Sequence, residues 1–549
     1  MTSAASLAMV YRYHDGTKHN FNAFAKSLGY LDWASQPRPF RTYAGAPAFA
    51  LNPAPDAPAD GYIQNQSTFD RLPDPSAARV GAGSIGDFLR HALGLSAWKQ
   101  LGSSRWALRV NPSSGNLHPT AAYVICGPVR GLAAEPAVYH YAPDRHALER
   151  RCTFDADAWQ HVCGGRHDVL HVALTSIHWR EAWKYGERAF RYCQHDIGHA
   201  IGAIAFSAGV LGWRAALLPA WSHHAIAAAT GVGRDADFFE SEREEPACMI
   251  AITSGDPLAC SEDNSARLAD AIFRGRWSGR ASQLSEDHVM WTFIDEAAAA
   301  TQSHGHPSAS AAVHRGPTAP PRAGRGLDAR ALLLQRRSAL AFDGRTTIDR
   351  STFISMLART LPGTEPPLRS LWWPPHVHLA IFVHRVDDVA PGIHVLVRDA
   401  RASERLRAAF HSEFLWDRAD ERLPLVRLSH GDTRALAARL SCDQDIAADG
   451  FFSLGMVADF DAGLREFGPS FYRQLFWETG AIGQVLYLEA EAAGARATGI
   501  GCFFDDPVHD VLGIRDHAFQ SLYHFTVGRH VEDPRLTTEP GYPSPSFSV

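Results

Sequence analysis

The sequence lacks any apolar run approaching the roughly 20 residues that a membrane-spanning helix needs. It also lacks an excess of positive charge, because 53 Lys and Arg residues face 59 Asp and Glu residues, for a formal net charge of −6. Such a chain has no global basic field to hold nucleic acid or anionic lipid. The start, Met1–Ala5, has no basic region of the kind that opens a secretory signal. We therefore expect a cytoplasmic protein with no nucleic-acid or membrane partner.

Closely spaced cysteines are missing as well. The eight cysteines are scattered over the chain and form no CxxC pair, which favours reduced thiols over a disulfide framework or a zinc ribbon. No GxGxxG motif follows a predicted strand, so a Rossmann domain for a nicotinamide nucleotide is not expected. With 46% hydrophobic and 20% charged residues, the composition is that of a globular protein.

The 549 residues are too many for one ordinary domain. Residues 301–326 are rich in Pro, Gly, Ser and Ala and have no hydrophobic periodicity, which predicts a linker. Just before it, Ser285–Ala300 predicts a helix with Ser285 as its N-cap. The linker separates two parts of similar kind.

An internal repeat relates these two parts. Phe190–Ala215 aligns without a gap to Tyr472–Ala497, so that Asp196 falls on Glu478 and Gly198 on Gly480. Small and apolar residues occupy nearly every face of both segments, which predicts two helices buried at the centre of a fold or interface. The other expected elements occur in both parts; they are helices at Ser84–Leu93 and Arg350–Leu357, and strands at Ala121–Cys126, Val169–Thr175, Cys248–Thr253, His376–Val383, Ile393–Val397 and Leu522–Val527. Together they predict an α+β fold in two fused copies, a pseudo-dimer.

A candidate anion site lies in the second part, at Arg336, Arg337 and Ser338. Two guanidinium groups and a hydroxyl can clamp a phosphate, because arginine offers paired donors; the alternative is a solvated surface patch. The matching stretch of the first part, Asn65–Phe69, has no arginine pair.

The first part instead carries a polar loop, Arg109–Pro119, with Ser113, Ser114 and Asn116 around Gly115. Proline stiffens both ends, and Gly115 permits close backbone approach. Such a set suits the edge of a flat heterocycle with alternating N–H and C=O groups; a plain turn is the alternative. The second part has no such polar set in its corresponding region, Pro362–Pro367.

Other clusters could handle protons or metals. Lys184 and Tyr185 could form a proton-handling pair if a positive neighbour lowers the tyrosine pKa; the alternative is an ordinary surface pair. His195 and His199 have a zinc-binding spacing, but Asp replaces the Glu of HExxH. We interpret them as packing or hydrogen-bonding residues, and treat His223–His224 and Thr17–His19 in the same way, so no metal ligand is predicted.

These segments resemble the nitroreductase-like FMN oxidoreductases, and within them the SagB/ThcOx-type dehydrogenases that oxidise azolines to azoles in modified peptides. The resemblance covers about residues 81–275 and 327–549 and rests on five segments: RVNPSSGNLHP, WKYGERAFRYCQHDIGH, RRSALAF, TGIGCFFDDPVHDVLGI and FTVGRH. It implies an N-terminal extension (1–80), a SagB-type domain (81–275), a helix and linker (276–326) and a second nitroreductase-like domain (327–549). Each domain would have a central antiparallel or mixed sheet packed by helices.

The resemblance also implies where a cofactor binds. Family members usually dimerise, and each site draws on both subunits. Because the two halves here have lost complementary parts, we expect one FMN per chain between them. Residues from both halves would bind it, namely Arg336, Arg337, Ser338, Arg529 and Gly501 from the second half, and Arg109, Ser113, Ser114 and Asn116 from the first. Lys184 and Tyr185 would take the substrate proton while hydride leaves to flavin N5.

The function expected from this resemblance is an FMN-dependent oxidoreductase that dehydrogenates an azoline-like group of a peptide or small molecule. Two alternatives stay open, namely an NAD(P)H-dependent nitro or quinone reductase, and a non-catalytic flavin-binding subunit of a modifying complex. The chain would act as a monomeric pseudo-dimer or as a homodimer.

Overall fold

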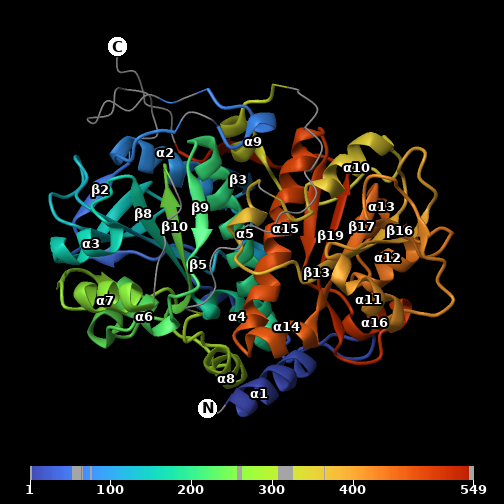
Figure 1. Cartoon of the computed structure of the whole chain (residues 1–549), viewed down its shortest axis with the longest axis horizontal. Helices are drawn as coiled ribbons and strands as arrows, with labels where there is room; N and C mark the ends of the chain where they lie inside the picture. Colours follow the sequence, from blue (N-terminus) through green and yellow to red (C-terminus); the bar gives the residue numbers. More distant parts are fainter. Residues whose placement is uncertain are drawn as a thin grey trace.

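The computed structural model describes residues 3–51, 64, 66–74, 77–255, 262–306, 326–363 and 365–542. Two antiparallel β-sheets, one from each half of the chain, flank a central pair of helices (Figure 1). The expected α+β class is confirmed. Most of the expected linker, residues 307–325, lies outside the described residues.

The first sheet is built from the first half of the chain. Its strands follow the order β11-β7-β6-β5-β8-β10-β9, with β2 also paired to β7. Their bounds are β2 (Ala48–Ala50), β5 (Thr120–Cys126), β6 (Ala137–Ala142), β7 (Ala147–Thr153), β8 (Val169–Ser176), β9 (Arg214–Leu217), β10 (Glu245–Thr253) and β11 (Arg276–Trp277). A short pair, β1 (Tyr43–Ala44) and β12 (Arg280–Ala281), lies apart from this sheet.

The second sheet repeats this path. Its order is β15-β16-β14-β13-β17-β19-β18, so β14-β13-β17-β19-β18 matches β6-β5-β8-β10-β9 strand for strand. The bounds are β13 (Val377–Val383), β14 (Gly392–Leu396), β15 (Asp417–Arg418), β16 (Leu425–Arg427), β17 (Phe452–Asp459), β18 (Arg496–Ile500) and β19 (Phe519–Gly528). The internal repeat read from the sequence is therefore a repeat of topology.

Helices cover both faces of each sheet. The outer face of the first sheet packs against α3 (Ala156–Cys163), α6 (His223–Thr230) and α7 (Glu262–Phe273). The outer face of the second packs against α11 (Ser403–Ala409), α12 (Arg434–Leu440), α13 (Ile446–Asp449) and α16 (Asp505–Leu512). The inner faces share one core with the central helices. Other helices of the two halves are α2 (Ala82–Ala92), α4 (His178–Tyr185), α9 (Ala329–Gln335), α10 (Arg350–Ala358) and α14 (Phe460–Phe467).

The central helices are the repeat segments, α5 (Ala189–Val210) and α15 (Phe471–Ala492). Every residue of α5 is buried, and the two helices lie side by side in the middle of the molecule (Figure 1). Their backbones touch at the aligned glycines, because a Cβ on Gly198 would lie 2.4 Å from the Trp477 carbonyl oxygen and 2.9 Å from the Gly480 Cα. Only glycine allows this approach.

The N-terminal segment also joins the halves. Helix α1 (Ser3–Gly16) packs on α8 (Thr292–Ala300) and reaches the second half, where Tyr11 donates a 2.7 Å hydrogen bond to Asp461. A further link between the halves is the buried carboxylate of Asp505, which binds Arg188 and Arg191 of the first half at 2.8 and 2.7 Å. Within the described part of the chain, no helix is both long and apolar enough to cross a membrane.

The helix expected at Ser285–Ala300 is shorter than expected. It begins at Thr292, and Ser285 is not its N-cap. The Ser285 hydroxyl instead donates to the Ser35 carbonyl oxygen, and its N–H donates to Glu242. These tertiary bonds outweigh the local capping signal.

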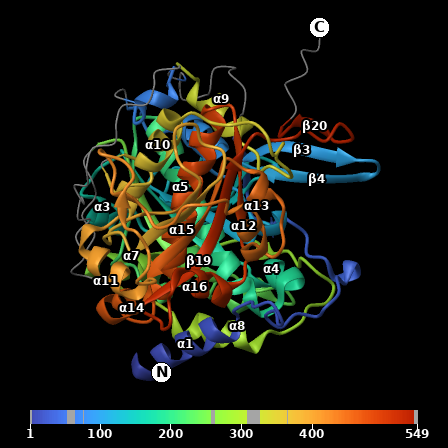
Figure 2. The ribbon, with the colours of Figure 1, turned by 90° about the vertical axis from the view of Figure 1, so that its right-hand side faces the viewer.

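A hairpin projects from the first half (Figure 2). Its strands are β3 (Leu95–Leu101) and β4 (Ser104–Arg109), and β20 (Thr537–Pro540) from the end of the second half pairs with β3. The C-terminal segment of one half is therefore bound to the other.

We expect Gly198→Ala to lower stability, because the added Cβ meets backbone atoms that cannot move without separating α5 from α15. The loss should be about 1–3 kcal/mol despite the higher helix propensity of alanine, and chemical denaturation measures it. Gly233→Ala is the control, since its Cβ would meet only Ala227, at 3.7 Å. Unchanged or increased stability of Gly198→Ala would show that the helices are not in backbone contact.

Candidate functional site

One cavity of about 500 Å³ lies between the two halves. The loop after β4 forms one wall, and the segment after α9 forms the facing wall. Nine of the predicted site residues line it, namely Arg109, Ser113, Ser114, Asn116, Tyr185, Arg336, Arg337, Ser338 and Gly501. Lys184 and Arg529 do not.

Arg336 docks the second half onto the first. It directly follows α9, is 3% exposed, and donates from Nε to the Val110 carbonyl oxygen and from Nη2 to that of Arg109, each at 3.2 Å. Its guanidinium lies 4.9 Å from the ring centre of Tyr487. Nη1 has no hydrogen-bond partner among the described residues. One donor of this arginine is therefore left for a ligand.

Arg337 and Ser338 continue the same wall. Arg337 donates to the Leu334 carbonyl oxygen at 2.6 Å and to that of Ser96, in β3, at 3.2 Å. Burial and the neighbouring Arg336 cation lower the pKa of Arg337 to about 10. The Ser338 hydroxyl shares a 2.8 Å hydrogen bond with that of Tyr487. Two adjacent guanidinium groups that repel one another in a cavity wall favour an anion between them.

The polar loop holds an unusual backbone shape. Gly115, Asn116 and His118 have φ of 56°, 60° and 55°, a region that side chains disfavour. The Ser113 hydroxyl accepts from the His118 N–H at 2.7 Å, and the Asn116 amide donates to the Ala107 carbonyl oxygen at 2.9 Å. These side chains line the cavity, as predicted for ligand contacts. They also hold the loop in shape, which was not predicted from the sequence.

Asp196 of α5 anchors this loop from below. Its carboxylate accepts from the N–H and the hydroxyl of Ser114, both at 2.9 Å, and it lines the cavity itself. Burial raises the pKa of Asp196 to about 7. The sequence pointed to Asp196 as a repeat position and as the Asp of the HExxH-like segment, but not as a cavity residue, although an acid on a fully buried helix is a signal for a site.

The Lys184–Tyr185 pair differs from expectation. Lys184 is exposed and outside the cavity lining, with its Nζ 5.2 Å from the Tyr185 ring centre. Burial, followed by the negative charge of Glu181, holds the pKa of Tyr185 well above its usual value. The expectation that a cation lowers this pKa is therefore wrong, because burial dominates. Tyr185 stays protonated and packs over Gly115, where a Cβ would lie 2.6 Å from its hydroxyl.

Arg529 is exposed and outside the cavity lining, and it donates to the Gly494 carbonyl oxygen at 2.9 Å. Its predicted role in binding a cofactor is not supported by this position. Sequence reasoning missed other lining residues that come from distant segments, namely Lys99 and Trp106 of the hairpin, Tyr487 of α15, Arg496 of β18, and Glu532 and Leu536 before β20. The Arg496–Glu532 ion pair and the pairing of β20 with β3 bring the last two to the site.

The histidine pair in α5 makes hydrogen bonds within the core. His195 Nε2 lies 3.0 Å from the Leu522 carbonyl oxygen, and His199 Nε2 lies 3.2 Å from the Tyr523 hydroxyl. Burial lowers the pKa of both rings, so both are neutral. This agrees with their interpretation as packing and hydrogen-bonding residues.

The equivalent position in the second half is closed. Glu478, which corresponds to Asp196, binds the Arg398 guanidinium and accepts from the Trp373 indole at 3.3 Å. Beside it, Pro362, Gly363 and Trp373 leave only about 20 Å³. The two halves share a topology, but the space beside Asp196 is a large cavity, whereas the corresponding space beside Glu478 is filled by side chains.

Comparisons with known proteins agree with this architecture. Residues 333–529 match the family model described as the Nitroreductase family. This match includes Arg336–Ser338 and Gly501, whereas the loop at Ser113–Asn116 lies outside it. The second half therefore contains a nitroreductase family domain, which supports an oxidoreductase.

One relative has a similar sequence over part of its length. A protein of Methanocaldococcus jannaschii named as a nitroreductase is 29% identical over 108 residues, which are 18% of this chain and 52% of that protein. The chain thus matches about half the length of this relative.

The crystal structure of a protein of Anabaena variabilis described as a nitroreductase covers 95% of this chain and 99% of its own, with a TM-score of 0.69 and 20% identity. The two share a fold over nearly the whole chain. The microcin synthetase McbBCD complex of E. coli, with its pro-MccB17 bound, covers 46% of this chain at a TM-score of only 0.27 and 15% identity, too low to indicate a common fold.

We expect Asp196→Asn to change how stability depends on pH. The folded chain retains a proton on Asp196 up to about pH 7, whereas the unfolded chain loses it near pH 4. Wild-type stability therefore falls as pH rises between these values. The asparagine variant lacks this loss, so its free energy of unfolding relative to wild type should rise from pH 4 to 7, by on the order of 3–4 kcal/mol, and then level off. Urea denaturation of the flavin-free protein measures this; a pH-independent difference would contradict the raised pKa.

Proposed function

We propose that this chain is an FMN-dependent oxidoreductase of the nitroreductase type that holds one FMN in the cavity between its halves. The observation that carries the proposal is the meeting of Arg336–Ser338 and the Ser113–Asn116 loop in one cavity of about 500 Å³. The closed counterpart beside Glu478 supports a single site per chain.

The charge of the cavity suits a phosphate. Five cations line it, namely Lys99, Arg109, Arg336, Arg337 and Arg496, against three acids, Asp196, Glu532 and Asp533. Glu532 is already paired with Arg496, at 2.9 Å. The unpartnered Nη1 of Arg336 and the crowding of Arg336 with Arg337 supply what an FMN phosphate would bind.

The aromatic and polar residues of the lining suit a flat ring. Trp106, Tyr192 and Tyr523 line the cavity with aromatic surface, and Ser113 and Asn116 add polar groups beside Gly115. An isoalloxazine ring has apolar faces and an edge of alternating N–H and C=O groups, so the lining residues fit it. When bound, FMN supplies a group that accepts or donates hydride.

The chain's own residues would handle the proton. Tyr185 lines the cavity and stays protonated, so its hydroxyl can donate a hydrogen bond to a substrate, whereas Asp196, with a pKa of about 7, can accept a proton near neutrality. Lys184 would act only through Tyr185.

We propose dehydrogenation of an azoline-like group in a peptide or small molecule, supported by the resemblance of the Lys184–Arg191 segment to SagB-type enzymes. The family match in the second half equally allows an NAD(P)H-dependent nitro or quinone reductase.

The purified chain should carry one FMN. Release of flavin by denaturation should give about one FMN per chain, and Arg336→Gln should lose most of it, since the cavity loses its most buried cation. Arg350→Gln is the control, because its guanidinium pairs with Asp420 outside the cavity. Arg529→Gln in the same series tests the role implied by the family. Two FMN per chain, or retention in Arg336→Gln, would contradict the proposal.

Turnover assays distinguish the candidate reactions. Oxygen consumption driven by an azoline-containing peptide supports the dehydrogenase, whereas steady NADPH oxidation with quinones supports the reductase. In either assay, Tyr185→Phe should lower kcat roughly 10²-fold or more while FMN content is retained, because it removes a hydrogen-bond donor from the cavity wall. Flavin without turnover in either assay would point to a binding subunit, and an unchanged rate in Tyr185→Phe would exclude its proposed role.

A further inference from the structure

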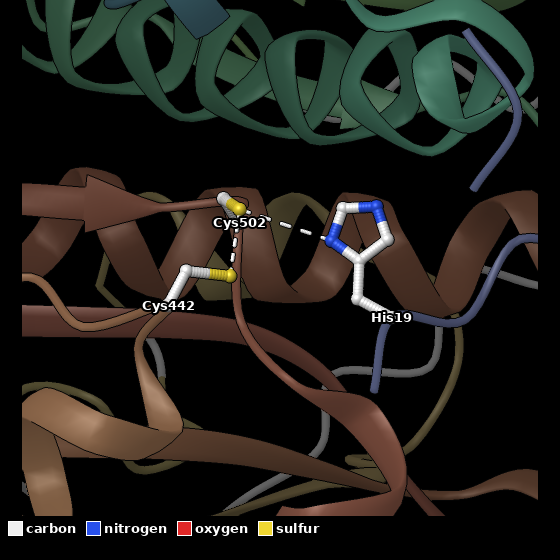
Figure 3. A group of neighbouring side chains, drawn as sticks. All are labelled: His19, Cys442 and Cys502. Carbon is white, nitrogen blue, oxygen red and sulfur yellow. Dashed lines mark hydrogen bonds between the residues drawn. The ribbon is translucent and has the colours of Figure 1, made fainter. Parts of the chain in front are cut away.

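A pair of thiols, Cys442 and Cys502, lies beside His19, with the two sulfur atoms next to one another (Figure 3). Cys442, just after α12, and Cys502, between β18 and α16, share a hydrogen bond of 2.7 Å between their sulfur atoms. His19 Nδ1, from the segment after α1, lies 3.8 Å from the Cys502 sulfur. Cys502 lines the cavity next to Gly501. No sequence pattern points to this pair, because its members are 60 positions apart.

Several contacts hold the two sulfur atoms together. Gln444 also lines the cavity, and it donates to the carbonyl oxygens of Ser441 and Cys502, at 2.7 and 3.1 Å. Cys442 itself has a φ of +55°, and the next residue, Asp443, +56°. Such backbone is strained for residues other than glycine, and it clusters at functional sites. The contacts of the neighbouring segments thus hold the Cys442 backbone in a conformation that it would not adopt alone.

The two thiols also differ in acidity. The hydrogen bond with Cys442, then His19 and the nearby Arg188 cation, lower the pKa of Cys502 against the opposing effect of burial. The same hydrogen bond raises the pKa of Cys442. A thiolate beside a thiol is the state from which a disulfide forms and is broken. By contrast, burial raises the pKa of the single thiols Cys126 and Cys152 to about 12.

A metal ion could also bind two cysteines and a histidine. A tetrahedral zinc site with Zn–S bonds of about 2.3 Å holds its sulfur atoms roughly 3.7 Å apart, and the sulfur atoms here are an ångström closer. The cation of Arg188 lies close to the pair and disfavours a second positive charge. The geometry is closer to that of a reactive thiol pair.

We propose that Cys442 and Cys502 form a dithiol–disulfide couple that exchanges two electrons with the flavin in the adjoining cavity. This inference rests on the proposed function for the identity of its redox partner. When the S–S bond forms, the two thiols together give up two electrons and two protons. A bound flavin would supply a two-electron acceptor for both electrons and one proton, and the other proton would leave to solvent. In the reverse direction, Cys442 and Cys502 would regain two electrons and two protons as the S–S bond breaks. The chain would then store four electrons, two in each centre.

Electron counting tests the couple. Anaerobic titration of the flavin-loaded chain with dithionite, followed by flavin absorbance and by thiol counting after an acid quench, should take up four electrons per chain. Cys442→Ser should take up two and keep its flavin. Cys163→Ala, which removes a buried thiol of α3 outside the cavity lining, is the control and should take up four.

Thiol counting gives an independent measure. The chain has eight cysteines, so the air-oxidised protein should show two fewer free thiols than the reduced protein, with Cys442 and Cys502 in one cross-linked peptide. A flavin-loaded wild-type chain that takes up only two electrons and keeps every thiol free would overturn the couple alone. Stoichiometric zinc that shields these thiols until a chelator is added would replace it with a metal site. A chain that binds no flavin would defeat the proposed function and this transfer together.

Discussion

The close contact of α5 with α15 is the constraint on which the rest of the molecule depends. Gly198 and Gly480 bring two helical backbones within van der Waals contact, and the inner face of each sheet packs on this pair in one shared core. The buried Asp505, bound by Arg188 and Arg191, adds a charged link. Because the halves cannot shift without opening this core, a cavity between them has fixed walls, as a preorganised site requires.

Two copies of one topology have diverged around this contact. In the first, Asp196 holds a polar loop open above it; in the second, the corresponding Glu478 binds Arg398 and the space is filled by Trp373 and its neighbours. The Arg336–Arg337 pair follows α9 in the second half, and the matching stretch of the first half, Asn65–Phe69, has no arginine. Each half therefore supplies what the other lacks, and a single chain completes the site that a symmetric dimer would form twice. The pairing of β20 with β3 then ties the end of the second half to the first, and Leu536, just before β20, lines the cavity.

The sequence predicted the parts of this structure that local patterns encode. Apolar faces, the aligned repeat and the turn residues located the central helices and most core strands, and the arginine pair and the polar loop proved to face one cavity. It could not predict features that arise only when distant segments meet. These features include the Cys442–Cys502 pair, the position of Leu536 in the cavity lining and the tertiary hydrogen bonds of Ser285. Nor could it weigh burial, which keeps Tyr185 protonated against the nearby Lys184.

The proposed flavin would lie across the two halves, with its phosphate at Arg336–Ser338 and its ring against the Ser113–Asn116 loop. A crystal structure of the chain grown with FMN would locate it. We expect density for one flavin in the cavity beside Asp196 and none beside Glu478. Flavin bound within one half, at two equivalent positions, or away from Arg336 would contradict it.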